Sequence, residues 1–268
     1  MLQRFAAVVV FLSCGAAFAG ATVTMHAQRG DSTLLLEGNK LRTEDLGQAH
    51  GGDVMIFDGD KQEMYLIETK SKSYTLLTPA LMKAKLGEAS AQMKSSMAKM
   101  PPEQKAQMKA AMERMDPETR KKMEAMMNGG SLQDNAVVQK VRYEKTGKRQ
   151  TVAGFPCEGY RQLVGDEVQT EGCFIPWSAG AVKKSDLGSL EKMREFIKEG
   201  GQGMLGGSAL AQLGEMPGFP GEMARRKKDG TEENQMTLTA IKQGSLSADQ
   251  FKVPAGYTRQ EMGHGERH

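Results

Sequence analysis

The chain has 268 residues, of which 39% are hydrophobic and 26% charged, and its formal net charge at pH 7 is +3. Basic and acidic residues are interspersed except at Arg225–Lys228, and no basic stripe is interleaved with aromatic residues, which argues against a nucleic-acid-binding protein. The length fits one domain with insertions or two small domains, and either can bury a core.

The N-terminus has the charged, apolar, small-residue order of a secretory signal peptide. Arg4 precedes an apolar run over 5–12, and Ala19 precedes Gly20, so we expect cleavage after Ala19 and a periplasmic or secreted protein. A bilayer span needs about 20 apolar residues, and this run is shorter, so we expect no transmembrane segment. The alternative is a lipoprotein signal in which Cys14 is lipidated.

Cys157 and Cys173 remain after removal of the signal, and an even pair in an oxidising compartment favours a disulfide. Gly165-Asp166 separates two runs typical of strands, 158–164 and 167–175, so a hairpin turning there places the cysteines opposite each other to within one residue. Closing so short a loop contributes on the order of 3 kcal/mol. Because there is no Cys-x-x-Cys sequence, a redox-active pair is the weaker interpretation.

Residues 22–78 have the period-two pattern of β-strands, with glycine turns that indicate successive hairpins. In the first run Val23, Met25 and Ala27 share one face. The runs 64–67 and 74–77 are apolar on both faces, so we expect both strands to be covered on both sides.

A helical insertion over 79–130, rich in Met, Ala, Lys and Glu, follows the strands. Pro101-Pro102 and Pro117 divide it, because proline is tolerated in the first turn of a helix but not in its interior. The sequence therefore predicts three helical pieces.

Strand patterns then return and alternate with one helix. The predicted elements are strands over 136–143 and 149–152, the cysteine hairpin, an amphipathic helix over 188–199, a glycine-rich loop over 200–221, and strands over 223–228 and 234–242. Leu190, Met193, Phe196 and Ile197 fall on one side of the helix. Residues 263–268 are typical of a disordered tail.

Several short motifs accompany this order of elements. They are Glu37-Gly-Asn-Lys-Leu-Arg42, Val54-Met-Ile-Phe-Asp-Gly59, Met64-Tyr-Leu-Ile67, Thr151-Val-Ala-Gly-Phe-Pro-Cys-Glu-Gly-Tyr160, Phe219-Pro220, Asp229-Gly230, Leu246-Ser247 and Phe251-x-Val253-Pro254-x-Gly256-Tyr257. Together they resemble the LolA/LolB-like superfamily of periplasmic lipoprotein carriers, most of all its uncharacterised exported branch, a domain of unknown function.

This resemblance implies an α+β fold, in which a curved antiparallel sheet, a half-open β-barrel, wraps over helices around an apolar concavity. The mature chain over 20–262 would then be a single LolA-like domain, interrupted by the Met-rich insertion over 79–130 and the loop over 200–221. Either segment is long enough to plug the concavity.

Catalysis has little support in the sequence. His26 lies on the polar face of its strand, and neither it nor His50 belongs to a Ser/His/Asp or Cys/His pattern. Dinucleotide, phosphate-loop and zinc-protease motifs are lacking. We therefore predict a protein that is not an enzyme and needs no cofactor.

The methionines of the insertion recur at helical spacing, and three interpretations stay open. The thioether stripes can pack on the sheet or on each other, because Met fills irregular gaps. They can instead form an adaptable surface for a lipid tail or a greasy partner. Thirdly, they can bind Cu(I) or Ag(I), for which the candidate ligands are Met93, Met97, Met100, Met108, Met112 and Met115.

We predict a non-enzymatic carrier or sensor of an apolar ligand, with a lipid or a lipidated envelope protein as its partner. Apolar sheet walls would hold the ligand, and the Met-rich and Gly-rich segments would act as a lid. The predicted lining residues are Val54, Ile56, Tyr65, Ile67 and Leu76 from the sheet and Met93, Met97, Met108 and Met112 from the lid. The alternatives are copper handling and a structural envelope protein with a filled core.

Overall fold

The computed structural model describes residues 20–28, 30–44, 53–104, 107, 120, 141–182, 187–200, 216–227 and 231–261, without the side chains of residues 93, 94 and 97. The predicted signal peptide and the predicted tail over 263–268 lie outside the described residues.

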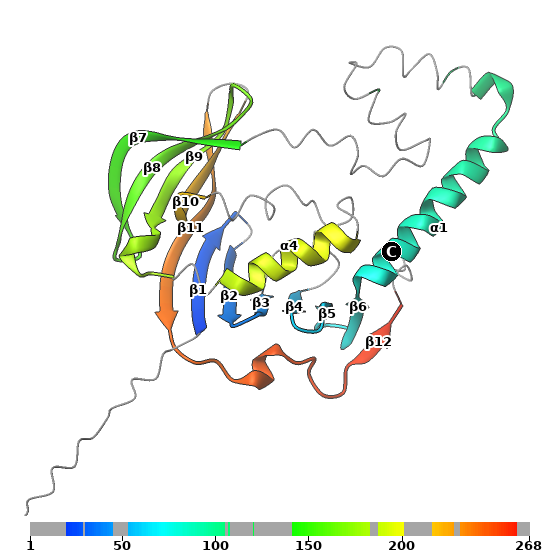
Figure 1. Cartoon of the computed structure of the whole chain (residues 1–268), viewed down its shortest axis with the longest axis horizontal. Coiled ribbons are helices and arrows are strands. Elements are labelled where there is room, and N and C mark those ends of the chain that lie inside the picture. Colours follow the sequence, from blue (N-terminus) through cyan, green and yellow to red (C-terminus); the bar gives the residue numbers. More distant parts are fainter. Residues whose placement is uncertain are drawn as a thin grey trace, which may run out of the picture.

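A large, open and curved sheet of twelve strands forms the described part of the chain (Figure 1). The strands are β1 (Gly20–Ala27), β2 (Gly30–Glu37), β3 (Lys40–Glu44), β4 (Val54–Asp58), β5 (Glu63–Glu68), β6 (Ser73–Leu77), β7 (Val141–Val152), β8 (Phe155–Val164), β9 (Glu167–Pro176), β10 (Gly218–Arg226), β11 (Glu232–Gln243) and β12 (Thr258–Gln260). Their order is β12-β6-β5-β4-β3-β2-β1-β11-β10-β9-β8-β7, and neighbours are antiparallel except β12 and β6.

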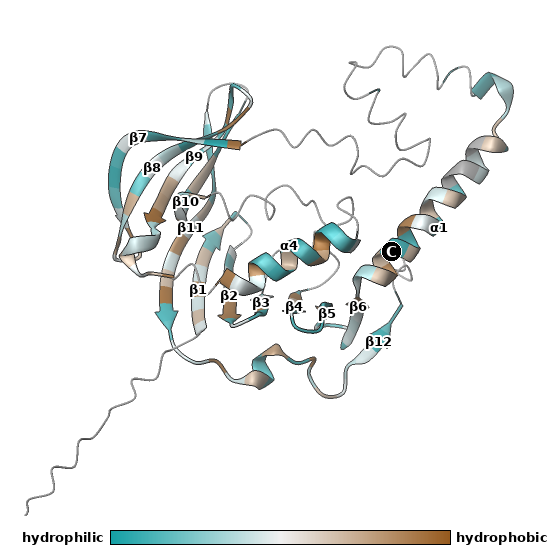
Figure 2. Cartoon of the chain, viewed as in Figure 1, coloured by the Kyte–Doolittle hydropathy of each residue, from teal (hydrophilic) through white to brown (hydrophobic). Residues whose placement is uncertain are grey.

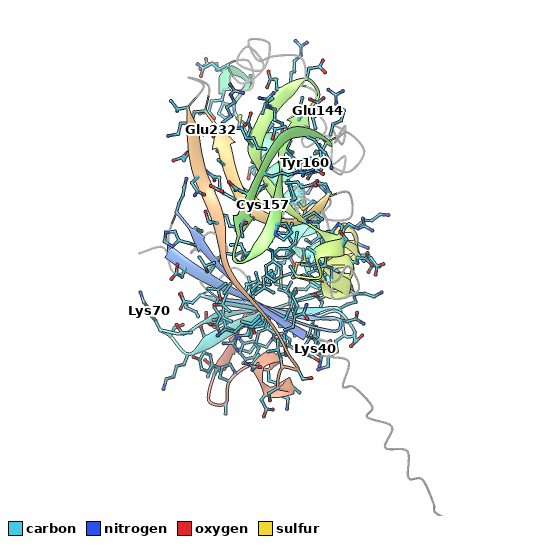
Figure 3. All side chains as sticks on the ribbon, turned by 90° about the vertical axis from the view of Figure 1, so that its left-hand side faces the viewer. Lys40, Lys70, Glu144, Cys157, Tyr160 and Glu232 are labelled. Atoms are coloured by element: carbon cyan, nitrogen blue, oxygen red, sulfur yellow. A yellow bond between two sulfur atoms is a disulfide. The ribbon has the colours of Figure 1, made fainter. Side chains whose placement is uncertain are left out.

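The sheet consists of two meanders, β1–β6 and β7–β11, which are joined where β1 pairs with β11. Figure 3 shows the two halves at opposite ends of the molecule, with Lys40 and Lys70 at one end and Glu144 and Glu232 at the other. The β1–β6 meander confirms the predicted succession of hairpins. In the second half the Tyr143 and Tyr160 rings both meet the ring of buried Phe174 edge-on.

The described part of the chain includes the α-helices α1 (Pro79–Ala98) and α4 (Gly188–Gly200) and the 3-10 turns η2 (Trp177–Ala179) and η5 (Ala248–Phe251). The predicted amphipathic helix over 188–199 is confirmed as α4, which carries both hydrophilic and hydrophobic positions (Figure 2). Its four predicted apolar residues, from Leu190 to Ile197, are buried. They pack on one face of the β1–β6 meander.

Close contacts at two glycines fix the position of α4 on β3 and β4. A Cβ atom added at Gly59, in the β4–β5 turn, would lie 2.7 Å from Lys192 Cβ, and one added at Gly188 would lie 3.1 Å from Asn39 Oδ1. The Phe57 and Phe196 rings meet edge-on with centroids 5.4 Å apart. The glycine turns that mark the hairpins in the sequence therefore also form the surface on which α4 packs.

Two buried apolar clusters lie on opposite faces of the β1–β6 meander. The helix-side core includes Phe57, Met64 and Leu77 together with the buried face of α4. The strap-side core includes Ile56 and Ile67 and is covered by residues 244–260, which we call the C-terminal strap. The expectation that the runs 64–67 and 74–77 are covered on both sides is confirmed in part, because both faces carry buried residues while Leu66 on the helix side stays partly exposed.

The C-terminal strap is attached to the sheet at several points. Phe251 is buried in the strap-side core, and Arg42 donates a hydrogen bond of 2.9 Å from Nη1 to the Gln250 carbonyl oxygen. Glu37 Oε2 accepts a hydrogen bond of 2.9 Å from the Leu246 backbone. The strap ends in β12, which adds to the outer edge of β6 in parallel.

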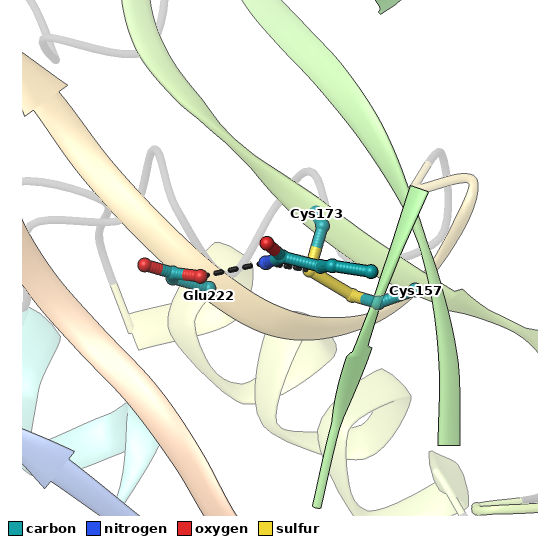
Figure 4. The surroundings of a disulfide bond; sticks show 4 residues. Cys157, Cys173 and Glu222 are labelled. Atoms are coloured by element: carbon teal, nitrogen blue, oxygen red, sulfur yellow. Dashed lines mark hydrogen bonds between the residues drawn. A yellow bond between two sulfur atoms is a disulfide. The ribbon is translucent and has the colours of Figure 1, made fainter. Parts of the chain in front are cut away.

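The predicted hairpin at Gly165-Asp166 and the disulfide between Cys157 and Cys173 are both present (Figure 4). A β-bulge between Gln162 and Leu163 shifts the register, so Cys173 faces Gly159 and not Glu158. Because side chains alternate along a strand, this shift brings both sulfurs to the same face of the sheet. Without the bulge the two cysteines would point to opposite faces.

The predicted glycine-rich loop over 200–221 is wrong at both ends. Gly200 is the last residue of α4, and β10 begins at Gly218, while residues 201–215 lie outside the description. Glycine in sequence indicates a loop, but in β10 it permits close contact between neighbouring strands. A Cβ atom added at Gly221 would lie 2.6 Å from Cys157 Sγ, and one added at Gly218 would lie 2.2 Å from the Ile175 carbonyl oxygen.

The structure corrects one predicted element boundary, within β7, and confirms another, at the end of α1. The strands predicted over 136–143 and 149–152 are one strand, β7, with a register shift between Lys145 and Arg149. The predicted break at Pro101-Pro102 is confirmed, because α1 ends at Ala98 and residues 102–104 are helical again. The predicted break at Pro117 lies outside the described residues.

Two glycine substitutions test the role of close contact at the disulfide. We expect Gly221→Ala to destabilise the oxidised protein by on the order of 1–3 kcal/mol, because the new methyl group collides with Cys157 Sγ. The control is Gly87→Ala in α1, where the added Cβ has open space; we expect stabilisation by about 0.5–1 kcal/mol. Urea unfolding measures both, and equal effects would contradict this account.

Candidate functional site

The helix-facing side of the β1–β6 meander carries a row of three half-buried apolar side chains and one buried threonine, next to the row that α4 covers. Its members are Leu34 on β2, Thr43 on β3, Met55 on β4 and Leu66 on β5, which face one another across successive strand pairs. We call this row the apolar strip. Leu34, Met55 and Leu66 are partly exposed and pack against the helix-side core, so the strip extends buried apolar surface toward solvent.

Polar residues follow the strip on the side away from the covered row. Ser32 and Glu68 lie two residues from Leu34 and Leu66 on the same strands and hence on the same face. Asp53, two residues before Met55, accepts hydrogen bonds from the Thr69 hydroxyl and backbone N–H, and these lower the pKa of its carboxyl group. Across this face, the row under α4 is buried and apolar, the apolar strip beside it is partly exposed, and the row after the strip carries negatively charged side chains.

Thr43 is the one polar member of the strip. Its exposed fraction is 6%, and Oγ1 makes no hydrogen bond within the described part of the chain. The partly exposed aliphatic and thioether groups beside it are suited to contacts with an apolar molecule, through burial of their remaining surface.

The structure places the predicted sheet lining on the opposite face. Val54, Ile56 and Ile67 are buried in the strap-side core, with Tyr65 packed against it, and strand alternation puts Leu76 on the same side. Tyr65 donates a hydrogen bond of 2.6 Å to Glu63 Oε2, and its pKa is raised by burial and by that carboxylate. These residues do not share a wall with the helices, so this part of the predicted site is corrected.

The error has a simple physical reason. In the runs Val54–Asp58 and Glu63–Glu68 both alternate sets of side chains are apolar, so periodicity identifies two faces but does not assign the helices to one of them. The set formed by Met55 and Leu66 was equally visible in the sequence. A contact such as Phe57 with Phe196 was needed to choose between them.

The predicted methionine sites are only partly within the described residues. Met82 is fully buried, and a Cβ atom added at Gly200 would lie 2.8 Å from Met82 Sδ, so α1 is fixed to the end of α4. Most described side chains of α1 beyond its second turn are exposed, and the helix extends away from the sheet (Figure 1).

Met100 is half-buried. Met108, Met112 and Met115 lie outside the described residues, as do the side chains of Met93 and Met97. The lid and metal interpretations therefore stay predictions.

Other sequence expectations concern the remaining polar groups. His26 is exposed, as predicted, and its Nδ1 lies 2.7 Å from Asp31 Oδ1, while His50 lies outside the description.

Within the described ranges, no three His, Cys, Asp or Glu side chains gather in a way that could hold a metal ion. The described helices include none that combines the length and apolarity needed to span a membrane.

A family model described as a domain of unknown function, DUF4412, matches residues 81–257. The chain belongs to the DUF4412 family. The matched range begins in α1 and ends in the C-terminal strap, so the apolar strip precedes it. The predicted likeness to a domain of unknown function is confirmed, whereas membership of the LolA/LolB-like superfamily stays a prediction. No curated protein matches the chain.

Several solved structures are similar to the chain, among them the following two. An uncharacterized conserved protein from Thermus thermophilus is 6% identical, with a TM-score of 0.43 and 91% of each chain covered. A chain from the complex of MucA and MucB of Pseudomonas aeruginosa is 11% identical, with a TM-score of 0.35, and the match covers 88% of this chain and 55% of that one.

Adjacent residues on β5 test the assignment of the two faces. We expect Leu66→Lys to leave the protein folded, because the partly exposed side chain can reach solvent. We expect Ile67→Lys to destabilise it by more than about 4 kcal/mol, because Ile67 is 1% exposed beneath the strap and a buried charge is left unpaired. Thermal unfolding followed by circular dichroism compares the two variants, and a reversed order would contradict the assignment.

Proposed function

We propose that this member of the DUF4412 family is an exported, non-enzymatic binding protein that holds a lipid or a lipidated envelope partner on the apolar strip. The observation that carries the proposal is the row of Leu34, Met55 and Leu66, partly exposed and continuous with the helix-side core. Covering these side chains with a ligand removes apolar surface from water, which is favourable in the same way as burial of the core.

The strip alone supports only weak binding. Leu34, Met55 and Leu66 are each already about two-thirds buried or more, so completing their burial contributes at most on the order of 1–3 kcal/mol in total. A dissociation constant in the micromolar range requires about 8 kcal/mol. Additional contacts are therefore part of the proposal, and a covering segment or a polar contact would supply them.

The two segments predicted to form a lid begin close to each other, at the contact between α1 and α4. Residue 201 follows Gly200, whose Cα faces the thioether of Met82 near the start of α1. The Gly-rich segment and the Met-rich insertion thus both continue from the junction of α1 and α4. A joint role of the two segments as a cover over the strip is part of the proposal, and it has to come from residues beyond α1, because α1 itself extends away from the sheet (Figure 1).

Export is supported by two features of the described fold. The first strand begins at Gly20, the residue that follows the predicted cleavage site. A disulfide joins Cys157 and Cys173, as is usual outside the reducing cytosol. We expect the mature protein to begin at Gly20 and to weigh two hydrogen atoms less than its reduced form. N-terminal sequencing and mass spectrometry check this, and an intact N-terminus in the exported fraction would contradict it.

The binding proposal predicts acyl species that co-purify with the protein. Native mass spectrometry of protein from its own envelope or secreted fraction should show a mass excess that matches fatty acyl or phospholipid species. We expect Met55→Lys and Leu66→Lys to lose this excess, because a charge then stands in the strip. The control is Leu76→Lys, a half-buried position on the opposite face, which should keep it.

Other masses would decide against the proposal. An excess that matches bound copper, lost on Met→Leu substitution in α1, would favour the metal-handling alternative. A bare polypeptide in every preparation would favour a structural protein with a filled core. Loss of the acyl species from Leu76→Lys as well would show that the effect does not depend on the strip.

A further inference from the structure

The start of β1 lies against the carboxylate of Glu37. Gly20 is paired with Glu37 across β1 and β2, and a Cβ atom added at Gly20 would lie 2.0 Å from Glu37 Oε2. Because the nitrogen of any residue lies about 2.5 Å from its Cβ position, the Gly20 nitrogen is at most about 4.5 Å from this carboxylate oxygen. Only glycine leaves room for the carboxylate at this position.

Two backbone oxygens border the same place. The Cβ position of Gly20 lies 2.7 Å from the Gly244 carbonyl oxygen and 3.0 Å from the Leu36 carbonyl oxygen. Three oxygens, one of them from a carboxylate, thus surround the start of β1. An ammonium group has three N–H donors and a positive charge, so this set of oxygens suits it better than the single N–H of a peptide bond.

The carboxylate of Glu37 has no cationic partner within the described part of the chain. Its Oε2 accepts a hydrogen bond from the Leu246 backbone N–H, which attaches the C-terminal strap. The basic side chains on the same face are Lys40, Arg42 and Lys242. Lys40 pairs with Asp58 at 3.8 Å, Arg42 pairs with Glu44 at 2.7 Å, and Lys242 is exposed. The charge of Glu37 is therefore available to a further cation.

We propose that Glu37 binds the α-ammonium group that signal-peptide cleavage exposes at Gly20. This inference rests on the export proposed for the protein, and it assigns a binding site to the new N-terminus. Before cleavage the Gly20 nitrogen belongs to a peptide bond and carries no charge. After cleavage it is a cation beside a carboxylate that lacks one. The same carboxylate then joins the first strand to the C-terminal strap through Leu246.

The pKa of the N-terminal amine tests the ion pair directly. The mature protein is purified from the exported fraction with isotope-labelled glycine, and the Gly20 Cα resonance is followed by NMR during a pH titration. We expect the amine to titrate about one pH unit higher in the wild-type protein than in Glu37→Gln, because a neighbouring carboxylate favours the ammonium form. Glutamine keeps the shape and still accepts the hydrogen bond from Leu246, so the strap stays attached.

The matched control is Glu68→Gln, which removes an exposed carboxylate four strands away from β1 and should leave the pKa of the amine unchanged. An extra alanine before Gly20 moves the amine away from Glu37 and should lower its pKa as Glu37→Gln does, without any change at Glu37 itself. Equal pKa values in the wild type and in Glu37→Gln, in a protein that begins at Gly20, would overturn this inference alone. An exported protein that still carries residues before Gly20 would contradict the proposed export and this inference with it.

Discussion

The packing of α4 on β3 and β4 is the interaction on which the rest of the β1–β6 half depends. Phe196 meets Phe57 edge-on, and the Lys192 side chain of α4 and the Asn39 carbonyl oxygen leave no room for a larger residue at Gly59. Since side chains alternate along each strand, the docked helix selects one set for the core. That selection leaves the next row, from Leu34 to Leu66, partly exposed at the border of the helix.

The opposite face of the same strands is closed by the chain itself. The C-terminal strap covers Ile56 and Ile67, inserts Phe251 and ends as a parallel strand beside β6. A sheet with apolar residues on both sides needs two covers, and the fold provides a helix for one and an irregular segment for the other. On the helix-covered face the apolar strip continues beyond the core, and the proposed ligand would complete the burial of that strip.

The disulfide between Cys157 and Cys173 depends on a β-bulge in the strand pair that carries it. The bulge after Gln162 turns Cys157 and Cys173 to one face, and Gly221 leaves room for their sulfurs where β10 crosses. Gln150 donates hydrogen bonds to Cys173 Sγ and to Glu222 Oε2, which connects β7, β9 and β10 around the bridge (Figure 4). Three strands that are distant in sequence thus share one small, tightly packed region.

Local sequence was enough to predict the hairpins, the disulfide partners and the apolar side of α4, because these follow from turn residues, spacing and a 3.6-residue period within short segments. It did not reveal which face of β4 and β5 receives the helix, since Met55 and Ile56 are equally apolar neighbours and both faces are buried in part. It also misassigned Gly218 and Gly221, whose reason for being glycine is a contact with Ile175 or Cys157 rather than a turn. These points were settled by the tertiary fold, because each depends on which surfaces meet across long separations in sequence, and local periodicity carries no information about that pairing.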